Sequence, residues 1–234
     1  MRKKNRVFLL SAIAVLMTIA LVSCGVKKEE VRVSPKGSDI SAEEAIVLLK
    51  EGNNRFIEGE TIPPNLSKSR LEDLVKNGQY PYAVILSCSD SRVPPELIFN
   101  EGIGNIFSIR NAGNVVDKVT LGSGEYGSKF LKAPLIVVLG HTHCGAVKAT
   151  IQGANEGENI AAIQKLITPA FDKAKSETND HNKLYELTEI ANVQNSITQI
   201  KQSEIIQELL KENKVKIVGA MYSLETGKVE FLED

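Results

Sequence analysis

The sequence has no tryptophan, few other aromatic residues (5% in all) and only three cysteines among its 234 residues. So few aromatic rings exclude a base-stacking platform for single-stranded nucleic acid. The chain also lacks an excess of positive charge. Four of its 28 basic residues stand in the first six positions, which leaves 24 basic against 29 acidic residues in the rest. Such a chain offers no basic face to a phosphate backbone, so we expect no nucleic-acid partner.

The amino-terminal segment has the pattern of an export signal. A basic start over 1–6 precedes an apolar run over 7–22, and the run ends at Leu-Val-Ser-Cys24-Gly. A run of this length is short for a membrane span and is typical of a secretory signal. The tetrapeptide resembles the lipobox of bacterial lipoproteins, which implies that Cys24 carries the lipid and becomes the first mature residue. A plain secretory signal or an uncleaved anchor is the alternative.

We therefore expect a signal peptide over 1–23, a flexible tether over 24–40 and one domain over 41–234. The tether is polar and contains glycine, serine and proline, a composition typical of linkers. The remainder has the length of a single domain. On this interpretation the protein is exported and held at a cell membrane by its lipid, on a periplasmic or extracellular face.

The rest of the sequence alternates strand and helix signals. Ser41 and Glu44 form a capping-box pattern at the start of a helix. Further helices are expected over 66–76, 119–131, 158–175 and 182–212, and strands over 82–87, 105–109, 135–139, 214–222 and 228–232. The continuous apolar strands suit a parallel sheet that is buried on both faces. We therefore predict an α/β fold with a mainly parallel central sheet, covering helices and a carboxyl-terminal antiparallel hairpin.

Two polar motifs directly follow two of the predicted buried strands. The first is Cys88-Ser-Asp90-Ser-Arg92 and the second is His141-Thr-His-Cys144-Gly. Sites in parallel sheets form at the carboxyl ends of strands, so the two motifs are expected to meet. In His-x-x-Cys the two ligands stand about one helical turn apart, on the same side. Two thiolates and one imidazole suit tetrahedral zinc, and three protein ligands leave a fourth position open for chemistry.

The two cysteines also allow a simpler interpretation, as a disulfide or as two buried thiols. The charged neighbours weigh against it. Asp90 and Arg92 directly follow an apolar strand, where a carboxylate and a guanidinium need to be paired or coordinated. A disulfide explains neither residue.

At this point the sequence resembles a known family. CSDSR, the segment Arg110-Asn-Ala-Gly-Asn and GHTHCG together resemble the β-class carbonic anhydrases, from about residue 41 to the carboxyl end. The resemblance implies reversible hydration of carbon dioxide to bicarbonate by zinc-bound hydroxide, with one zinc ion per chain. It implies that Cys88, His141 and Cys144 bind the zinc. Asp90 and Arg92 match the family's dyad: in open sites Arg92 holds Asp90 away from the metal, and in closed sites Asp90 occupies the fourth position.

The resemblance also implies substrate-binding residues and an oligomer. Gln79, Gly145, Phe107 and Tyr126 match substrate-binding positions, and in the family the tyrosine comes from the neighbouring subunit. Gln79 has the alternative role of a turn residue, and the two aromatic residues have that of core side chains. Family members are dimers or multiples of dimers, so a homodimer or a higher multiple is expected here.

Some positions depart from the family pattern. Ala112 stands where plant-type members have valine, which predicts a roomier pocket. Arg110 and Tyr222 match two of three residues of a regulatory bicarbonate site, but Ile85 replaces its tryptophan, which weakens the case for bicarbonate regulation. Three other functions stay open at this stage: hydrolysis of carbon disulfide or carbonyl sulfide on the same fold, non-catalytic binding of zinc or bicarbonate, and a disulfide-stapled binding lipoprotein.

Overall fold

The computed structural model describes residues 35–59, 65–154 and 157–233. The predicted signal peptide, the lipid site at Cys24 and most of the tether lie outside the described residues. Residues 35–40 are described, and they pack on the domain: Gly37 is buried, and its N–H donates to the carbonyl oxygen of Tyr80 over 3.3 Å. The ordered fold therefore begins before the predicted boundary at Ser41. No helix within the described ranges is long and apolar enough to cross a membrane.

The described residues form a five-stranded sheet in the order β2-β1-β3-β4-β5. Its strands are β1 (Ala83–Cys88), β2 (Ile106–Asn111), β3 (Leu135–His141), β4 (Lys216–Tyr222) and β5 (Val229–Phe231). Strands β2, β1, β3 and β4 run parallel to one another, and β5 pairs antiparallel with β4. Every residue of β1 and β3 is buried, as continuous apolar runs predict for central parallel strands. The predicted α/β architecture with an antiparallel end is confirmed.

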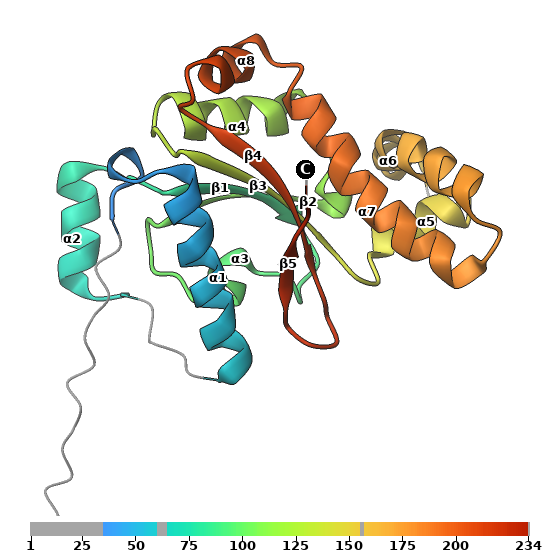
Figure 1. Cartoon of the computed structure of the whole chain (residues 1–234), viewed down its shortest axis with the longest axis horizontal. Helices are drawn as coiled ribbons and strands as arrows, with labels where there is room; N and C mark the ends of the chain where they lie inside the picture. The colour runs from blue at the N-terminus through green and yellow to red at the C-terminus, as the bar shows by residue number, and fades with distance from the viewer. Residues whose placement is uncertain (1–34, 60–64, 155–156, 234) are drawn as a thin grey trace, which may run out of the picture. The chain divides into compact units, whose positions relative to one another are not determined.

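Helices cover both faces of this sheet (Figure 1). One apolar cluster joins α1 and α3 to one face, and a second joins α4, α7 and α8 to the other. A third and smaller cluster joins α5 and α6 to the end of β1. The helical elements are η1 (Gly37–Asp39), α1 (Ala42–Glu58), α2 (Lys68–Asn77), α3 (Pro95–Ile98), η2 (Ala112–Asn114), α4 (Lys118–Lys129), α5 (Gly145–Ile151), α6 (Glu158–Glu177), α7 (His181–Ile200) and α8 (Glu204–Lys211).

Capping side chains set the helix boundaries. Ser41 and Glu44 form the predicted capping box at the start of α1, which satisfies two backbone donors of the first turn. The second helix begins two residues later than predicted, because the Ser67 side chain accepts the N–H of Arg70.

The prediction of one helix over 182–212 is wrong. The segment is divided into α7 and α8 by a turn at 201–203. Ser203 ends the turn and caps α8, since its hydroxyl accepts the N–H of Ile206 over 3.2 Å. Four polar residues over 201–204 interrupt the apolar spacing at this break, and Ser203 supplies the cap of the new helix.

Candidate metal centre

The two motifs meet at the carboxyl edge of the sheet. Cys88 is the last residue of β1, His141 is the last residue of β3, and Cys144 directly precedes α5. Their ligand atoms lie within 4.8 Å of one another, and all three residues are buried. The segment from His141 to Cys144 is a turn and not the expected helical turn, because His143 adopts the left-handed conformation with a φ of 57°.

The imidazole of His141 is oriented for a ligand. Its Nδ1 donates to the backbone carbonyl of Thr142 over 2.9 Å, which leaves Nε2 as the free lone pair. That Nε2 is buried and has no hydrogen-bond partner among the described residues. Burial lowers the pKa of His141, but the neighbouring Cys88 sulfur and the Thr142 carbonyl raise it by more. A buried nitrogen without a partner is costly unless a group outside the chain binds it.

The two cysteines form an asymmetric pair. Both are free, so the disulfide interpretation is wrong. The neighbouring Cys144 side chain lowers the pKa of Cys88 to about 4, with smaller contributions from His141 and from the N–H of Gly113. The Cys88 thiolate and burial raise the pKa of Cys144. A thiolate, a second sulfur and an imidazole are the donor set that zinc prefers, and the pair can give up its shared proton when a cation binds.

Asp90 is held by Arg92 in a bidentate pair. The guanidinium donates from Nε to Oδ1 over 2.9 Å and from Nη2 to Oδ2 over 2.7 Å, and the Arg92 backbone N–H adds a bond of 2.9 Å to Oδ1. The pair holds the pKa of Asp90 well below its usual range. Because both carboxylate oxygens are occupied by Arg92, the carboxylate is turned to its partner and is not one of the three clustered ligands. This is the arrangement that the resemblance implies for an open site.

Arg110 braces the first motif from the neighbouring strand. Its Nε donates to the carbonyl of Cys88 over 3.2 Å, and its Nη2 donates to that of Asp90 over 2.7 Å. Ile85 lies fully buried in β1. Arg110, which matches one residue of the regulatory bicarbonate site, therefore holds the loop of the first motif.

Gly113 supports Cys88 from the loop after β2. Its N–H donates to the Cys88 sulfur over 3.3 Å. It adopts a φ of 78°, and a Cβ at this position would lie 2.8 Å from Cδ1 of Ile167. Only glycine takes this conformation without strain. The sequence shows that the segment from Arg110 to Asn114 resembles the family, but it does not reveal the bond from Gly113 to the Cys88 sulfur.

The second motif has an exposed rim. His143 is exposed and pairs with Glu225. Thr142 donates to the same carboxylate over 2.9 Å. Gly145 is the first residue of α5, and a Cβ added to it would meet nothing within 4 Å. The space beside its Cα is therefore open.

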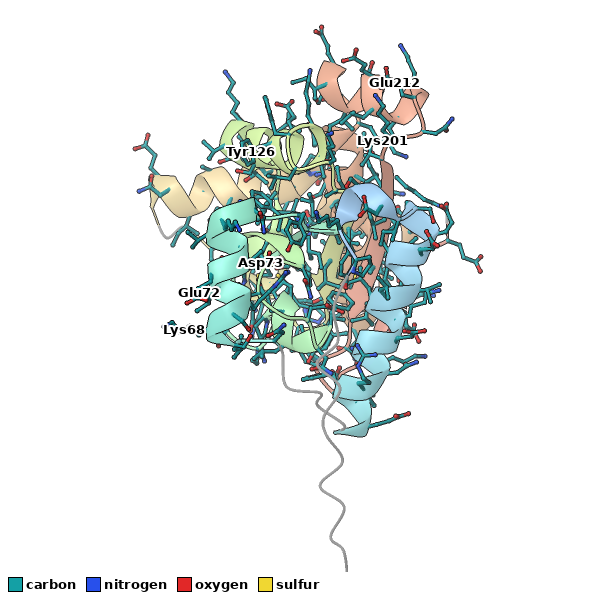
Figure 2. All side chains as sticks on the ribbon, turned by 90° about the vertical axis from the view of Figure 1, so that its left-hand side faces the viewer. Lys68, Glu72, Asp73, Tyr126, Lys201 and Glu212 are labelled. Carbon is teal, nitrogen blue, oxygen red and sulfur yellow. The ribbon has the colours of Figure 1, made fainter. Side chains whose placement is uncertain are left out.

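Three predicted substrate-binding residues are not near the cluster of their own chain. Phe107 pairs with Val84, whereas Cys88 pairs with Asn111, so the ring lies four strand positions, ~13 Å, from the metal ligand. Gln79 precedes the start of β1 and thus lies at the same distant edge. Tyr126 of α4 stands beside Phe107, with ring centroids 6.0 Å apart. Figure 2 shows this tyrosine on the side of the molecule that also carries α2.

A large groove lined by described residues is a separate feature. It has a volume of about 1160 Å³ and lies at the amino ends of the strands, where Lys201 and Glu212 line it (Figure 2). None of the motif residues lines it. Groove size therefore does not locate the chemical centre of this chain.

Two side chains of α7 that sequence reasoning missed also reach the centre. Glu189 accepts the backbone N–H of Cys144 over 2.9 Å, and Asn192 donates to the carbonyl of Gly113 over 2.7 Å. Burial raises the pKa of Glu189 despite the bond from Cys144. The signal that could have revealed them is the presence of polar residues on the buried side of a helix.

Comparison with known proteins gives one consistent family. The family model described as "Carbonic anhydrase" matches residues 83–229. The carbonic anhydrase of Mycolicibacterium smegmatis is 38% identical over 204 residues, which cover 84% of this chain and 94% of that protein. Carbonic anhydrase 2 of Mycobacterium tuberculosis is 35% identical over 184 residues, covering 77% and 87%.

Solved structures agree with the sequence comparison. The Coccomyxa β-carbonic anhydrase in complex with acetazolamide is 26% identical, with a TM-score of 0.64 over 78% of this chain and 83% of that one. The β-carbonic anhydrase CcaA is 25% identical, with a TM-score of 0.63 over 82% and 92%. The likeness therefore extends well beyond the two motifs.

Proposed function

Because this chain belongs to the β class of the carbonic anhydrase family, we propose that Cys88, His141 and Cys144 hold its zinc ion and that Asp90 and Arg92 serve the reaction beside it. The protein is a zinc enzyme that catalyses the reversible hydration of carbon dioxide to bicarbonate and a proton. The observation that carries the assignment of residues is the cluster itself: three buried ligand atoms within 4.8 Å.

The donor set fits the metal. His141 presents a buried Nε2 without a hydrogen-bond partner in the described part of the chain, and Cys88 is stabilised as a thiolate. When bound at this site, zinc would lower the pKa of a water molecule to ~7 and so supply hydroxide near neutral pH. Three protein ligands leave one position open for that chemistry.

Asp90 and Arg92 orient the attack in this proposal. Arg92 keeps Asp90 ionised and fixes both of its oxygens by the bidentate pair. A carboxylate only accepts hydrogen bonds, so Asp90 would accept one from a hydroxide held at the open position and would orient its oxygen toward carbon dioxide. Gly145 contributes its backbone N–H to the substrate oxygen from the first turn of α5, where no side chain blocks the approach.

We further propose that a second copy of this chain completes each site. Gln79, Phe107 and Tyr126 lie at the amino edge of the sheet, away from the cluster of the same chain, so they can reach substrate only in a neighbouring copy. The outer face of α4 supports this assembly. Val119, Tyr126 and Phe130 follow one another along the helix at spacings of seven and four residues, and all three are exposed. Such an apolar stripe is typical of a covered surface.

We also propose a lipid anchor on Cys24, which would place the enzyme at a membrane outside the cytoplasm. The support is the sequence pattern alone, since the segment lies outside the described residues. A Cys24→Ser variant, expressed in a bacterium with a lipoprotein pathway, is expected to leave the membrane fraction. The same distribution for the variant and the parent would contradict the anchor.

Metal analysis of single-ligand variants tests the assignment of the site. Cys88→Ser, His141→Ala and Cys144→Ser are each expected to lose zinc and carbon dioxide hydration together. His181→Ala is the matched control, because this histidine stands on α7 outside the cluster. A ligand variant that keeps one zinc and the parent rate would remove that residue from the site.

A further inference from the structure

One buried polar stripe on α7 is not explained by the packing of the sheet. Thr188, Glu189, Asn192 and Ser196 are each no more than 6% exposed. Buried polar groups are costly unless their hydrogen bonds are satisfied. Thr188 bonds within its own helix, to the carbonyl of Leu184 over 2.6 Å. The side chain of Glu189 reaches the loop that carries Cys144, and those of Asn192 and Ser196 reach the loop of Gly113 and Asn114, which bonds to the Cys88 sulfur.

Glu189 contacts the loop between His141 and Cys144. Its Oε1 accepts the N–H of Cys144 over 2.9 Å, and the neighbouring N–H of His143 also interacts with the carboxylate. His143 has the left-handed φ of 57°, which is strained for a non-glycine residue and is kept only where surrounding contacts hold it. Consecutive N–H groups around a left-handed residue form a concave anion site. Glu189 occupies that site and so holds the turn that brings the two ligands together.

Asn192 contacts the loop that supports Cys88. Its Nδ2 donates to the carbonyl of Gly113 over 2.7 Å, and one turn further along the helix Ser196 donates to the carbonyl of Asn114 over 2.9 Å. Gly113 in turn donates its N–H to the Cys88 sulfur. The same helix therefore fixes both the Cys144 loop and the donor that faces the Cys88 sulfur.

We propose that Glu189 and Asn192 are positioning residues, which hold the Cys144 loop and the Gly113 loop beside Cys88 at the separation that binds zinc. The inference rests on the proposed zinc site and adds residues that neither motif contains. Because the loops are held before the metal arrives, the protein avoids ordering them on binding. Loss of an outer-shell bond of this kind typically weakens metal affinity ~10- to 100-fold.

The experiment measures zinc affinity of the metal-free chain from residue 25 onward, by competition with a chelator, together with the unfolding temperature of the metal-free form. Glu189→Met removes the acceptor at similar length, and Glu189→Gln keeps an acceptor oxygen. Asn192→Leu removes the donor to Gly113. Thr188→Val is the matched control, since this buried hydroxyl bonds only within α7.

Glu189→Met and Asn192→Leu are expected to bind zinc ~10- to 100-fold more weakly, whereas Glu189→Gln and Thr188→Val bind it as the parent does. If the parent chain binds zinc and both apolar variants keep its affinity, with only a lower unfolding temperature, the residues are structural and the inference is wrong. Equal weakening in Thr188→Val would also overturn it. Should Glu189→Met fail to fold, Asn192→Leu decides. A parent chain that binds no zinc would instead overturn the proposed function.

Discussion

The proposal that two copies share each site predicts that one charge on α4 will abolish activity without removing zinc. Phe130 is 69% exposed and stacks on Tyr126, with ring centroids 5.5 Å apart. It lies on the apolar stripe that the second copy would cover. In Phe130→Glu, a carboxylate replaces that ring, and assembly would bury it without a partner.

The size of the effect follows from the exposed area. A phenylalanine side chain buries ~200 Å² when covered, so the exposed fraction of 69% leaves ~140 Å² for the interface. At ~25 cal/mol per Å² this area is worth ~3 kcal/mol in each copy. A two-fold interface uses the same residue twice. Even if only half of the area is covered, the dimer loses ~3 kcal/mol, which is ~10²-fold in Kd.

Sedimentation across a range of protein concentrations, with zinc content and carbon dioxide hydration measured on the same samples, checks this prediction. Phe130→Glu should dissociate, keep one zinc per chain and lose hydration in step with dissociation, because Gln79, Phe107 and Tyr126 then face solvent. Ile160→Glu is the control: it places the same charge on an exposed apolar residue of α6, away from α4 (Figure 1). A fully active monomer would refute the shared site, and an undisturbed dimer would refute the role of the α4 stripe.

Three further predictions concern the cluster and its rim. Arg92→Ala releases both oxygens of Asp90, so kcat should fall ~10²-fold because the carboxylate is no longer oriented. Arg92→Lys should not restore kcat, because lysine cannot donate the two parallel bonds of a guanidinium. An unchanged kcat would contradict the role of the pair. Gly113→Ala forces alanine into a φ of 78°, so the free energy of unfolding in urea should fall by ~1–2 kcal/mol. Zinc affinity should fall as well, because the bond from residue 113 to the Cys88 sulfur is disturbed. An unchanged free energy of unfolding together with an unchanged zinc affinity would contradict this prediction. Hydrogen bonds lower the pKa of Glu225 from 4.5 to about 2, so its contribution to stability is complete above pH 4.5 and is lost as the pH falls toward 2. The urea midpoints of the parent and of Glu225→Gln should therefore converge in acid. A difference that stays constant with pH would contradict this prediction.

Much of the architecture could be predicted from the sequence because the physical signals are local. The apolar runs that became β1 and β3 are buried at every residue, and the polar motifs directly after them lie at one sheet edge as parallel pairing requires. Ser41 and its capping partner also gave the correct start of α1. Such features depend on neighbours within a few positions of the chain.

The remaining features depend on contacts between distant positions. Glu189 and Asn192 bond to residues 45 and 79 positions away, and the pattern of α7 does not record those partners. Gln79, Phe107 and Tyr126 match family positions in sequence, but only the strand register shows that they lie at the opposite edge from Cys88. The break before α8 was missed because the predicted helix was continued through four polar residues, 201–204, which interrupt the apolar spacing and include the Ser203 cap.

The central claim is tested most directly by measuring zinc content and carbon dioxide hydration together on the chain from residue 25 onward, between pH 6.5 and 9, with and without a chelator. The account predicts one zinc per chain, hydration that disappears with the metal and returns when zinc is restored, and free thiols at Cys88 and Cys144 in the metal-free form. Zinc without hydration at any pH would contradict the catalytic assignment. A chain without zinc, with the two cysteines joined to each other, would contradict the metal centre itself.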